Sequence, residues 1–148
     1  MGKVIAEISM SVDGVVAGTD TSTEHRLGKD GGLLHDWMFE GTDAHRPAEP
    51  LVKGPTTFTF VTDGPESALR QAKAAAGDEN VVVMGGGTTM RQFLRAGLVD
   101  ELRLHVVPLL FGAGVRLFDA GIGEHVKLER TAVHETPNAT HLTFRVLS

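Results

Sequence analysis

The stretch VVVMGGGTTMRQFL, residues 81–94, joins an apolar run to three glycines and then to apolar residues at helical spacing. Residues 81–84 are mostly β-branched, which predicts a short strand buried on both faces of a sheet. The pattern that follows predicts a helix over 88–96, which Gly97 ends. The glycines therefore lie where a strand turns into a helix.

This glycine turn, residues 85–87, leaves backbone amides open at a helix N-terminus. Glycine has no Cβ to hold a ligand away, and the helix dipole places partial positive charge at the same point. Thr88 and Thr89 offer hydroxyl groups to an anion, or one of them caps the helix. Two interpretations stay open, a phosphate site and a tight turn needed only for packing. Met90 stands where the dinucleotide fingerprint G-x-G-x-x-G requires glycine, and no Walker lysine follows.

The composition is that of one ordinary domain over residues 1–148, with 41% hydrophobic and 22% charged residues. A net charge of -5 disfavours nucleic acid and acidic membrane surfaces as partners. The absence of cysteine excludes disulfides and thiolate chemistry. The N-terminus has no signal-peptide core and no apolar run has the length of a membrane span, so we expect a cytoplasmic protein.

The first half of the chain alternates strand and helix signals with long irregular stretches. We expect a first strand over residues 3–10, an irregular loop over 11–32 and a short helix over 33–38. A proline-rich connector over 40–55 leads to a strand over 56–62. Pro65 then starts a helix over 65–76, which ends at Gly77.

The second half closes the sheet. The segment DELRLHVV alternates apolar and polar residues and predicts a strand that begins near Glu101 and stops at Pro108. Two further alternating segments, 126–134 and 140–147, form a terminal hairpin around TPNA. This order predicts an α/β fold with a mixed sheet, mostly parallel inside and antiparallel at one edge, with ligands at the carboxyl ends of the strands.

Three segments carry a resemblance to a known family. ISMSVDGVVAG at 8–18, VVVMGGGTTMRQFLRAGLVDELRLHVVPLLFGAGVRLF at 81–118 and the closing hairpin resemble the dihydrofolate-reductase-like family, in the branch related to the reductase domain of bacterial riboflavin biosynthesis. The resemblance implies a dihydrofolate-reductase-like fold and NADPH as cofactor. It also implies hydride transfer to a small heterocyclic, pteridine- or pyrimidine-like substrate, because the cofactor supplies the hydride and the protein positions it.

The same resemblance suggests site residues. It places Ser11 and Asp13 beside the nicotinamide and substrate as the catalytic candidates, although Asp13-Gly14 also reads as a simple turn. Trp37 and Met84 are candidates for the substrate side. The residues that it places against the cofactor are Gly85, Gly86, Gly87, Thr88, Thr89, Met90 and Ala17.

The chain departs from the family in two places. The family carries a strand with a G-R-x-T motif, a helix and a further strand after the first helix, and these are missing between Ala44 and His45. Either the sequence omits a stretch, or the protein is naturally shortened, or a partner chain supplies the missing edge. In addition, Met84 stands where the phosphoribosyl-pyrimidine reductases carry an acidic residue, so the sequence does not identify the substrate.

Other chemistries find less support in the sequence. The seven histidines lack H-x-x-x-H or H-x-H spacing, so we expect no metal site, although His134 and His141 face each other across the predicted hairpin. Asp100 and Glu101 point to opposite faces of a strand, and no G-x-S-x-G elbow is present. We therefore expect an NADPH-dependent reductase that forms a homodimer through its edge strand and the LLFGAG region. The alternative is a catalytically silent nucleotide-binding or interaction module with the same fold.

Overall fold

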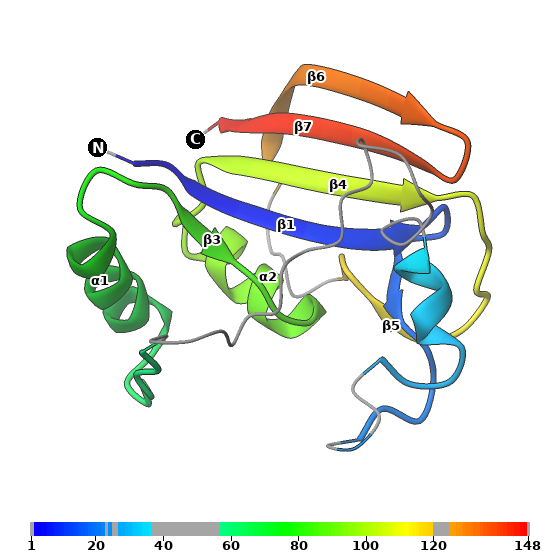
Figure 1. Cartoon of the computed structure of the whole chain (residues 1–148), viewed down its shortest axis with the longest axis horizontal. Coiled ribbons are helices and arrows are strands. Elements are labelled where there is room, and N and C mark those ends of the chain that lie inside the picture. The colour runs from blue at the N-terminus through cyan, green and yellow to red at the C-terminus, as the bar shows by residue number, and fades with distance from the viewer. Residues whose placement is uncertain (1, 23, 25–26, 37–56, 120–124, 148) are drawn as a thin grey trace.

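The computed structural model describes residues 2–22, 24, 27–36, 57–119 and 125–147. Five strands form one sheet in the order β3-β1-β4-β7-β6, and two short strands, β2 and β5, form a second one (Figure 1). The strands are β1 (Val4–Ser11), β2 (Val15–Ala17), β3 (Val81–Val83), β4 (Glu101–Val107), β5 (Val115–Arg116), β6 (Lys127–Thr136) and β7 (Ala139–Leu147). The helices are the 3-10 helix η1 (Gly31–Leu34), α1 (Pro65–Ala76) and α2 (Gly87–Arg95).

The central strand β1 pairs in parallel with β3 on one side and with β4 on the other. Strand β7 then pairs antiparallel to β4, and β6 pairs antiparallel to β7. The predicted mixed sheet with a parallel centre and a C-terminal antiparallel hairpin is therefore confirmed. The carboxyl ends of β1, β3 and β4 all lie at one end of the sheet, and their amino ends lie at the other end, on the left in Figure 1.

The main core lies between α1, α2 and one face of the sheet. Alternate residues of β1 and β4 point into it, as period-two side-chain alternation requires. The helices contribute apolar residues from their inner faces, so this face of the sheet is covered by apolar side chains. The buried members are Val4, Ala6, Val16, Leu69, Val83, Met90, Leu94, Val99, Leu102, Leu104 and Leu117.

Both α-helices begin and end close to the predicted residues. Pro65 occupies the first turn of α1, where its missing N–H removes no helical hydrogen bond. Gly77 ends this helix with a φ of 60°, which glycine adopts without a side-chain penalty. Helix α2 begins at Gly87 rather than at position 88, with Gly86 as its N-cap and no side-chain cap, so neither threonine caps the helix.

Three sequence predictions need correction. The described part of the predicted 56–62 strand, residues 57–62, belongs to no sheet; Thr57, Thr59 and Val61 instead line a cavity with α1. The physical reason is that the segment has no strand partner: β3 is the last strand on this side of the described sheet, and residues 57–62 do not pair with it. The predicted 33–38 helix is a short 3-10 helix that starts at Gly31, and its part beyond residue 36 lies outside the described residues. Finally, the predicted loop 11–32 contains β2.

Candidate functional site

The candidate site lies at the carboxyl ends of the three parallel strands. The glycine turn follows β3, residues 12–14 follow β1, and residues 108–114 follow β4. The small β2–β5 sheet lies beside them, because Leu117 donates its amide to Gly14 O at 2.9 Å. Since each of these segments leaves a different strand, the sheet holds them at one corner, where ligands of such sheets bind.

The three glycines of the turn have different surroundings. A Cβ on Gly87 would lie 2.9 Å from Arg116 O, so Gly87 is needed for close packing against β5. Gly85 has a φ of 149° and sits against Thr89. A Cβ on Gly86 would meet no atom within 4 Å. The packing interpretation therefore explains Gly87, whereas the space beside Gly86 is open to a ligand.

The first turn of α2 presents its amides toward this open space. The first amide bonded back along the helix is that of Met90, which donates to Gly86 O at 3.2 Å, so the amides of residues 87–89 precede the helical bonding. Thr88 is exposed and its Oγ1 accepts from Arg91 at 3.3 Å. The side chain of Met90 is fully buried in the core. The prediction that Met90 contacts the cofactor is therefore wrong for its side chain, because the helix turns it inward.

Ser11 and Asp13 form a local network that folds the corner. Ser11 Oγ accepts the amide of Val15 at 2.9 Å and donates to Asp13 Oδ1. The other bonds to Asp13 come from the amide of Gly112 to Oδ2 at 2.8 Å and the amide of Phe111 to Oδ1 at 3.1 Å. The hydrogen bond from Ser11, followed by those from the two amides, lowers the pKa of Asp13 to about 2.

This network changes the interpretation of the two predicted catalytic residues. Ser11 is fully buried and both of its hydrogen bonds are local, so it has no access to a substrate. A carboxyl group with a pKa near 2 is ionised at neutral pH and does not act as a general acid. The structure gives Ser11 and Asp13 the role of tying the loop after β1 to the loop after β4.

Two arginines fasten α2 to the small sheet. Arg91 Nη1 donates to Arg116 O at 2.5 Å and to Leu117 O at 3.1 Å, and its Nε lies 3.4 Å from Asp119 Oδ1. Arg116 Nη1 in turn donates to Asp13 O at 2.8 Å. These contacts fix the start of α2 relative to β5, and they place two cations within the corner that a charged ligand would enter.

The remaining predicted residues fall in different places. Ala17 is buried in β2 with Val115 as its strand partner. Met84 follows β3, is 56% exposed, and lines a cavity of about 200 Å³ between β3, α1 and α2. Trp37 lies outside the described residues, as do Ala44 and His45, where the missing segment is expected.

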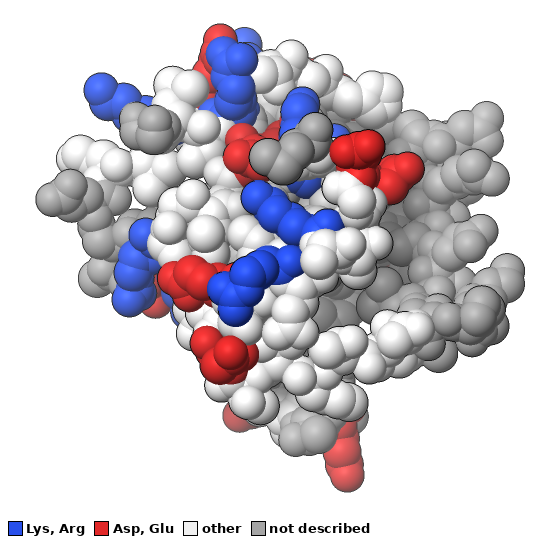
Figure 2. Space-filling view, turned by 90° about the vertical axis from the view of Figure 1, so that its left-hand side faces the viewer, with Lys and Arg blue, Asp and Glu red and all other residues white. Residues whose placement is uncertain are grey.

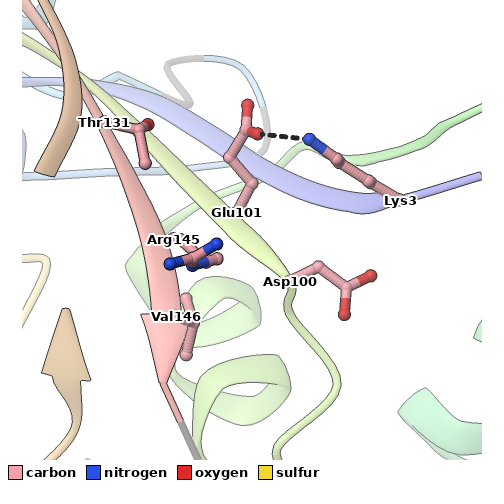
Figure 3. Close-up of a pocket in the computed structure, with 6 residues that line it drawn as sticks. All are labelled: Lys3, Asp100, Glu101, Thr131, Arg145 and Val146. Atoms are coloured by element: carbon pink, nitrogen blue, oxygen red, sulfur yellow. Dashed lines mark hydrogen bonds and ion pairs between the residues drawn. The ribbon is translucent and has the colours of Figure 1, made fainter. Parts of the chain in front are cut away.

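A second cavity lies at the opposite end of the sheet. It has a volume of about 300 Å³ and is lined by Lys3, Asp100, Glu101, Thr131, Arg145 and Val146 (Figure 3). Its charges have protein partners: Lys3 Nζ lies 3.4 Å from Glu101, and Asp100 accepts the amide of Val4 at 2.8 Å. Figure 2 shows cations and carboxylates side by side over this end of the molecule. We therefore interpret this cavity as part of an ion-pair surface, remote from the glycine turn.

One polar arrangement was not predicted from the sequence. His105 of β4 bonds to Glu7 of β1 on one side and to His141 of β7 on the other. His141 also stacks on His134, so the predicted cross-hairpin contact is confirmed. Among the described residues, no group of three or more metal-binding side chains is placed to hold a metal ion. This arrangement depends on how β1, β4 and β7 are aligned with one another, and the spacing of residues in the sequence does not give that alignment.

Comparison with known proteins identifies the family. The family model of the RibD C-terminal domain matches residues 43–142. The chain belongs to this family. Structural neighbours of the chain include proteins described as a riboflavin biosynthesis reductase and as a 5-amino-6-(5-phosphoribosylamino)uracil reductase. No helix among the described residues is long and apolar enough to cross a membrane.

Solved structures share the fold at low sequence identity. RibD of Acinetobacter baumannii (form 2) is 16% identical with a TM-score of 0.65, and the match covers 99% of this chain and 58% of that one. The riboflavin biosynthesis reductase Rib7 of Saccharomyces cerevisiae is 18% identical with a TM-score of 0.58, covering 99% of this chain and 89% of that one. At these identities the similarity shows the dihydrofolate-reductase-like fold alone.

A curated relative shows that this chain is a shortened member. Uncharacterized protein YwjB of Bacillus subtilis (strain 168) is 21% identical over 156 residues, which cover 78% of this chain and 82% of the relative. The aligned length exceeds the 148 residues of the chain, although only part of the chain takes part in it. Dozens of aligned positions therefore face a gap in this chain.

Proposed function

We propose that the protein is an NADPH-dependent reductase that transfers a hydride to a small heterocyclic, pteridine- or pyrimidine-like substrate. The observation that carries this proposal is the open space beside Gly86 at the N-terminus of α2, at the carboxyl edge of the sheet. Backbone amides at such a point bind phosphate groups. Membership of the RibD C-terminal domain family supports the choice of NADPH as the phosphate-bearing ligand.

The residues around the turn fit a pyrophosphate group. Gly86 leaves room for close approach, the amides of residues 87–89 supply donors, and the exposed hydroxyl of Thr88 supplies one more. When bound, NADPH supplies the hydride and its electron pair. The protein then has to hold the coenzyme and the substrate in register and to exclude water.

A binding titration tests the proposal. NADPH fluorescence should saturate at micromolar concentrations with the wild-type chain. Gly86→Val should weaken binding at least tenfold, about 1.4 kcal/mol, because a branched side chain would push the phosphates off the amides. Gly32→Val is the matched control, because a Cβ there also meets no atom within 4 Å. Unchanged NADPH affinity in a folded Gly86→Val variant would contradict the site.

The substrate class is tested with two compounds. A structural neighbour from Thermotoga maritima is described as a 5-amino-6-(5-phosphoribosylamino)uracil reductase. We propose this pyrimidine and dihydrofolate as the first substrates, with turnover followed as loss of NADPH absorbance. Oxidation of NADPH with either compound would assign the class, and none with both would exclude these two substrates.

The alternative function is a catalytically silent module that keeps the fold. The edge at β3 favours it, because β3 is the last strand of the described sheet on the side of the glycine turn. The two functions differ in NADPH binding and oxidation. A folded chain that shows no NADPH binding in the titration, or that binds NADPH and oxidises it with neither substrate, is the module, whereas a chain that binds and oxidises NADPH is the reductase.

We further propose that the protein is a cytoplasmic homodimer. Edge strand β6 and the LLFGAG segment, residues 109–114, supply the surface, and Leu109 packs against Val107 and Ala139 at the end of the hairpin. Leu110 is 72% exposed beside them. Sedimentation equilibrium should give twice the 15.8 kDa of one chain, and Leu110→Lys should shift the mass toward the monomer.

A further inference from the structure

The guanidinium group of Arg91 holds the start of α2 against the small sheet. Its Nη1 donates to Arg116 O at 2.5 Å and to Leu117 O at 3.1 Å. Its Nη2 donates to Thr88 Oγ1 at 3.3 Å, and its Nε lies 3.4 Å from the carboxylate of Asp119. Each nitrogen therefore has an acceptor or a counter-charge on the protein, and the side chain is only 14% exposed. A planar guanidinium suits such a set of acceptors, because its donors point in fixed directions.

The same guanidinium lies directly against the glycine turn. A Cβ added to Gly87 would lie 2.9 Å from Arg91 Nη1, closer than a real Cβ approaches another heavy atom. Gly87 is the first residue of α2, and Gly86 before it has open space around it. Residues four apart lie on one face of a helix, so Arg91 reaches back one turn to Gly87. Arg91 therefore borders the place where the proposed function puts the phosphate groups.

The bond to Thr88 decides how its hydroxyl group is used. A guanidinium only donates, so Thr88 Oγ1 is the acceptor in this bond and the hydroxyl proton is not used in it. Thr88 is exposed at the second residue of α2, so that proton can be donated to an anion at the helix start. Loss of the bond to Arg91 would free the threonine side chain to adopt other rotamers. Arg91 thus directs the hydroxyl group toward the open space.

The bonds at the end of β5 decide where the first turn of α2 lies. Leu117 is fully buried, its carbonyl accepts from Arg91, and its amide donates to Gly14 O at 2.9 Å. It therefore joins the loop after β1 to α2. The side chain of Arg116 extends this connection, because its Nη1 donates to Asp13 O at 2.8 Å. Through these bonds Arg91 fixes the amides of α2 relative to the loop at the carboxyl end of β1.

These contacts suit positioning better than direct contact with a ligand. The nitrogens of Arg91 already have partners on the protein, so a phosphate group would have to displace one of them. Arg95 offers a comparison, because it lies on the last turn of the same helix, carries the same charge and is exposed. It lies about 12 Å along the helix from Gly87. An effect of charge alone and an effect of geometry can therefore be separated on one helix.

We propose that Arg91 is the positioning residue of the candidate coenzyme site, an inference that rests on the proposed reductase function. It acts through two groups. It turns the hydroxyl proton of Thr88 toward the phosphate, and it holds the amides of residues 87–89 at a fixed place beside the small sheet. A lysine ammonium is one compact group and cannot span the acceptors that the two ends of the guanidinium reach, so lysine does not replace arginine here.

The first experiment compares Arg91→Lys with Arg95→Lys, which make the same substitution at the two ends of α2 and keep the charge. NADPH titration should show binding weaker by about fivefold or more in Arg91→Lys, because the fork of donors is lost. Arg95→Lys should change the affinity by less than about twofold. A folded Arg91→Lys chain with the affinity of the wild type would overturn the proposal.

The second experiment measures whether Arg91 acts through Thr88. Thr88→Val removes the hydroxyl group and keeps the shape of the side chain. In the wild type this change should weaken NADPH binding by about fivefold, whereas in Arg91→Lys it should weaken binding by less than about twofold, because the hydroxyl group is no longer aligned. An arginine that only stabilises the fold would give the same factor in both backgrounds, and that result would overturn the proposal.

The third experiment uses the wild type alone, so it does not depend on the folding of a variant. The guanidinium protons of Arg91 should give separate, slowly exchanging NMR signals in the unliganded protein, because protein acceptors hold the group in place. They should stay separate when NADPH is added. The exposed Arg95 is the internal reference for a mobile group. Signals of Arg91 that are averaged by rotation would overturn the positioning role.

The three experiments also separate this role from the reductase function. A folded wild-type chain that binds no NADPH removes the reductase, and the positioning role with it. A wild-type chain that binds NADPH, together with an Arg91→Lys chain that binds it equally well, removes the positioning role alone.

Discussion

The two edges of the main sheet are built differently. Strand β3 has three residues, all valine, and both the exposed Val82 within it and the exposed Met84 after it are apolar. Strand β6 has ten residues and carries Lys127, Glu129, Arg130 and Glu135. Charged side chains on an edge strand restrict pairing to a complementary partner, whereas the apolar edge of β3 is protected only by its short length.

This difference separates a charged edge of the sheet from an apolar one. The charged residues of β6 are typical of an edge strand that is protected against unspecific pairing. The β3 border has none, and Phe60, in the segment that the sequence predicts as a further strand, is 93% exposed. The main core depends on β1, β4 and the two α-helices, and neither edge strand contributes most of it.

The largest predicted effect compares the centre of the sheet with the charged edge. Leu102 of β4 is 1% exposed and Leu128 of β6 is 40% exposed. Leu102→Ala should lower the free energy of unfolding by about 2–5 kcal/mol, because it leaves a cavity in the core. Leu128→Ala should change it by less than about 0.5 kcal/mol. Urea denaturation measures both, and similar losses would show that β6 shares the core.

Much of the fold was readable from periodicity and turn residues. Pro65 and Gly77 predicted the bounds of α1, and the alternation from Glu101 to Val107 predicted β4, because both signals are local. The prediction of a strand over 56–62 was wrong because a strand forms only when it pairs with a neighbouring strand, and local sequence does not show whether that pairing occurs. β2 was missed because three residues within a glycine-rich loop give too short a pattern.

The site was predictable only in part. The glycine turn at a strand's carboxyl end was correctly placed, since strand, glycines and helix are contiguous in sequence. The hydrogen bonds to Asp13 depend on a loop about 100 residues away, which contains Phe111 and Gly112. The hydrogen bonds of His105 to Glu7 and His141 depend on the register of three strands, which only the structure provides.

The next prediction compares the two sides of the apolar edge itself. Val83 is buried in the main core, whereas Val82 is 47% exposed on the same strand. Val83→Ala should cost about 1.5 kcal/mol, the loss of two buried methyl groups. Val82→Ala should cost a few tenths of a kcal/mol. Equal costs in chemical denaturation would mean that the open face of β3 is covered in solution, for example by another chain.

A third prediction concerns the strand between the two edges and depends on pH. The hydrogen bond from His105 lowers the pKa of Glu7 below its ordinary 4.5. The stabilisation is therefore present above pH 4.5 and is lost as the pH falls through the lowered pKa. The denaturation midpoint of Glu7→Gln should be below that of the wild type at pH 7, and the two should converge in strong acid. A constant difference at all pH values would contradict the ionised pair.

The smallest effect on stability should come from placing a charge on the apolar edge. Val82→Lys adds a cation to β3 at an exposed position, so the free energy of unfolding should change by less than about 0.5 kcal/mol. Edge-to-edge association should nevertheless fall, because pairing would bury the ammonium group or bring two of them together. Light scattering over a concentration series would show less large aggregate for Val82→Lys, with the proposed dimer through β6 retained. Val133→Lys, at a 44% exposed position on β6, is the matched variant. It should weaken the proposed dimer through β6 and leave the amount of large aggregate unchanged. If both variants behaved alike, the contrast between the two edges would lose its physical basis.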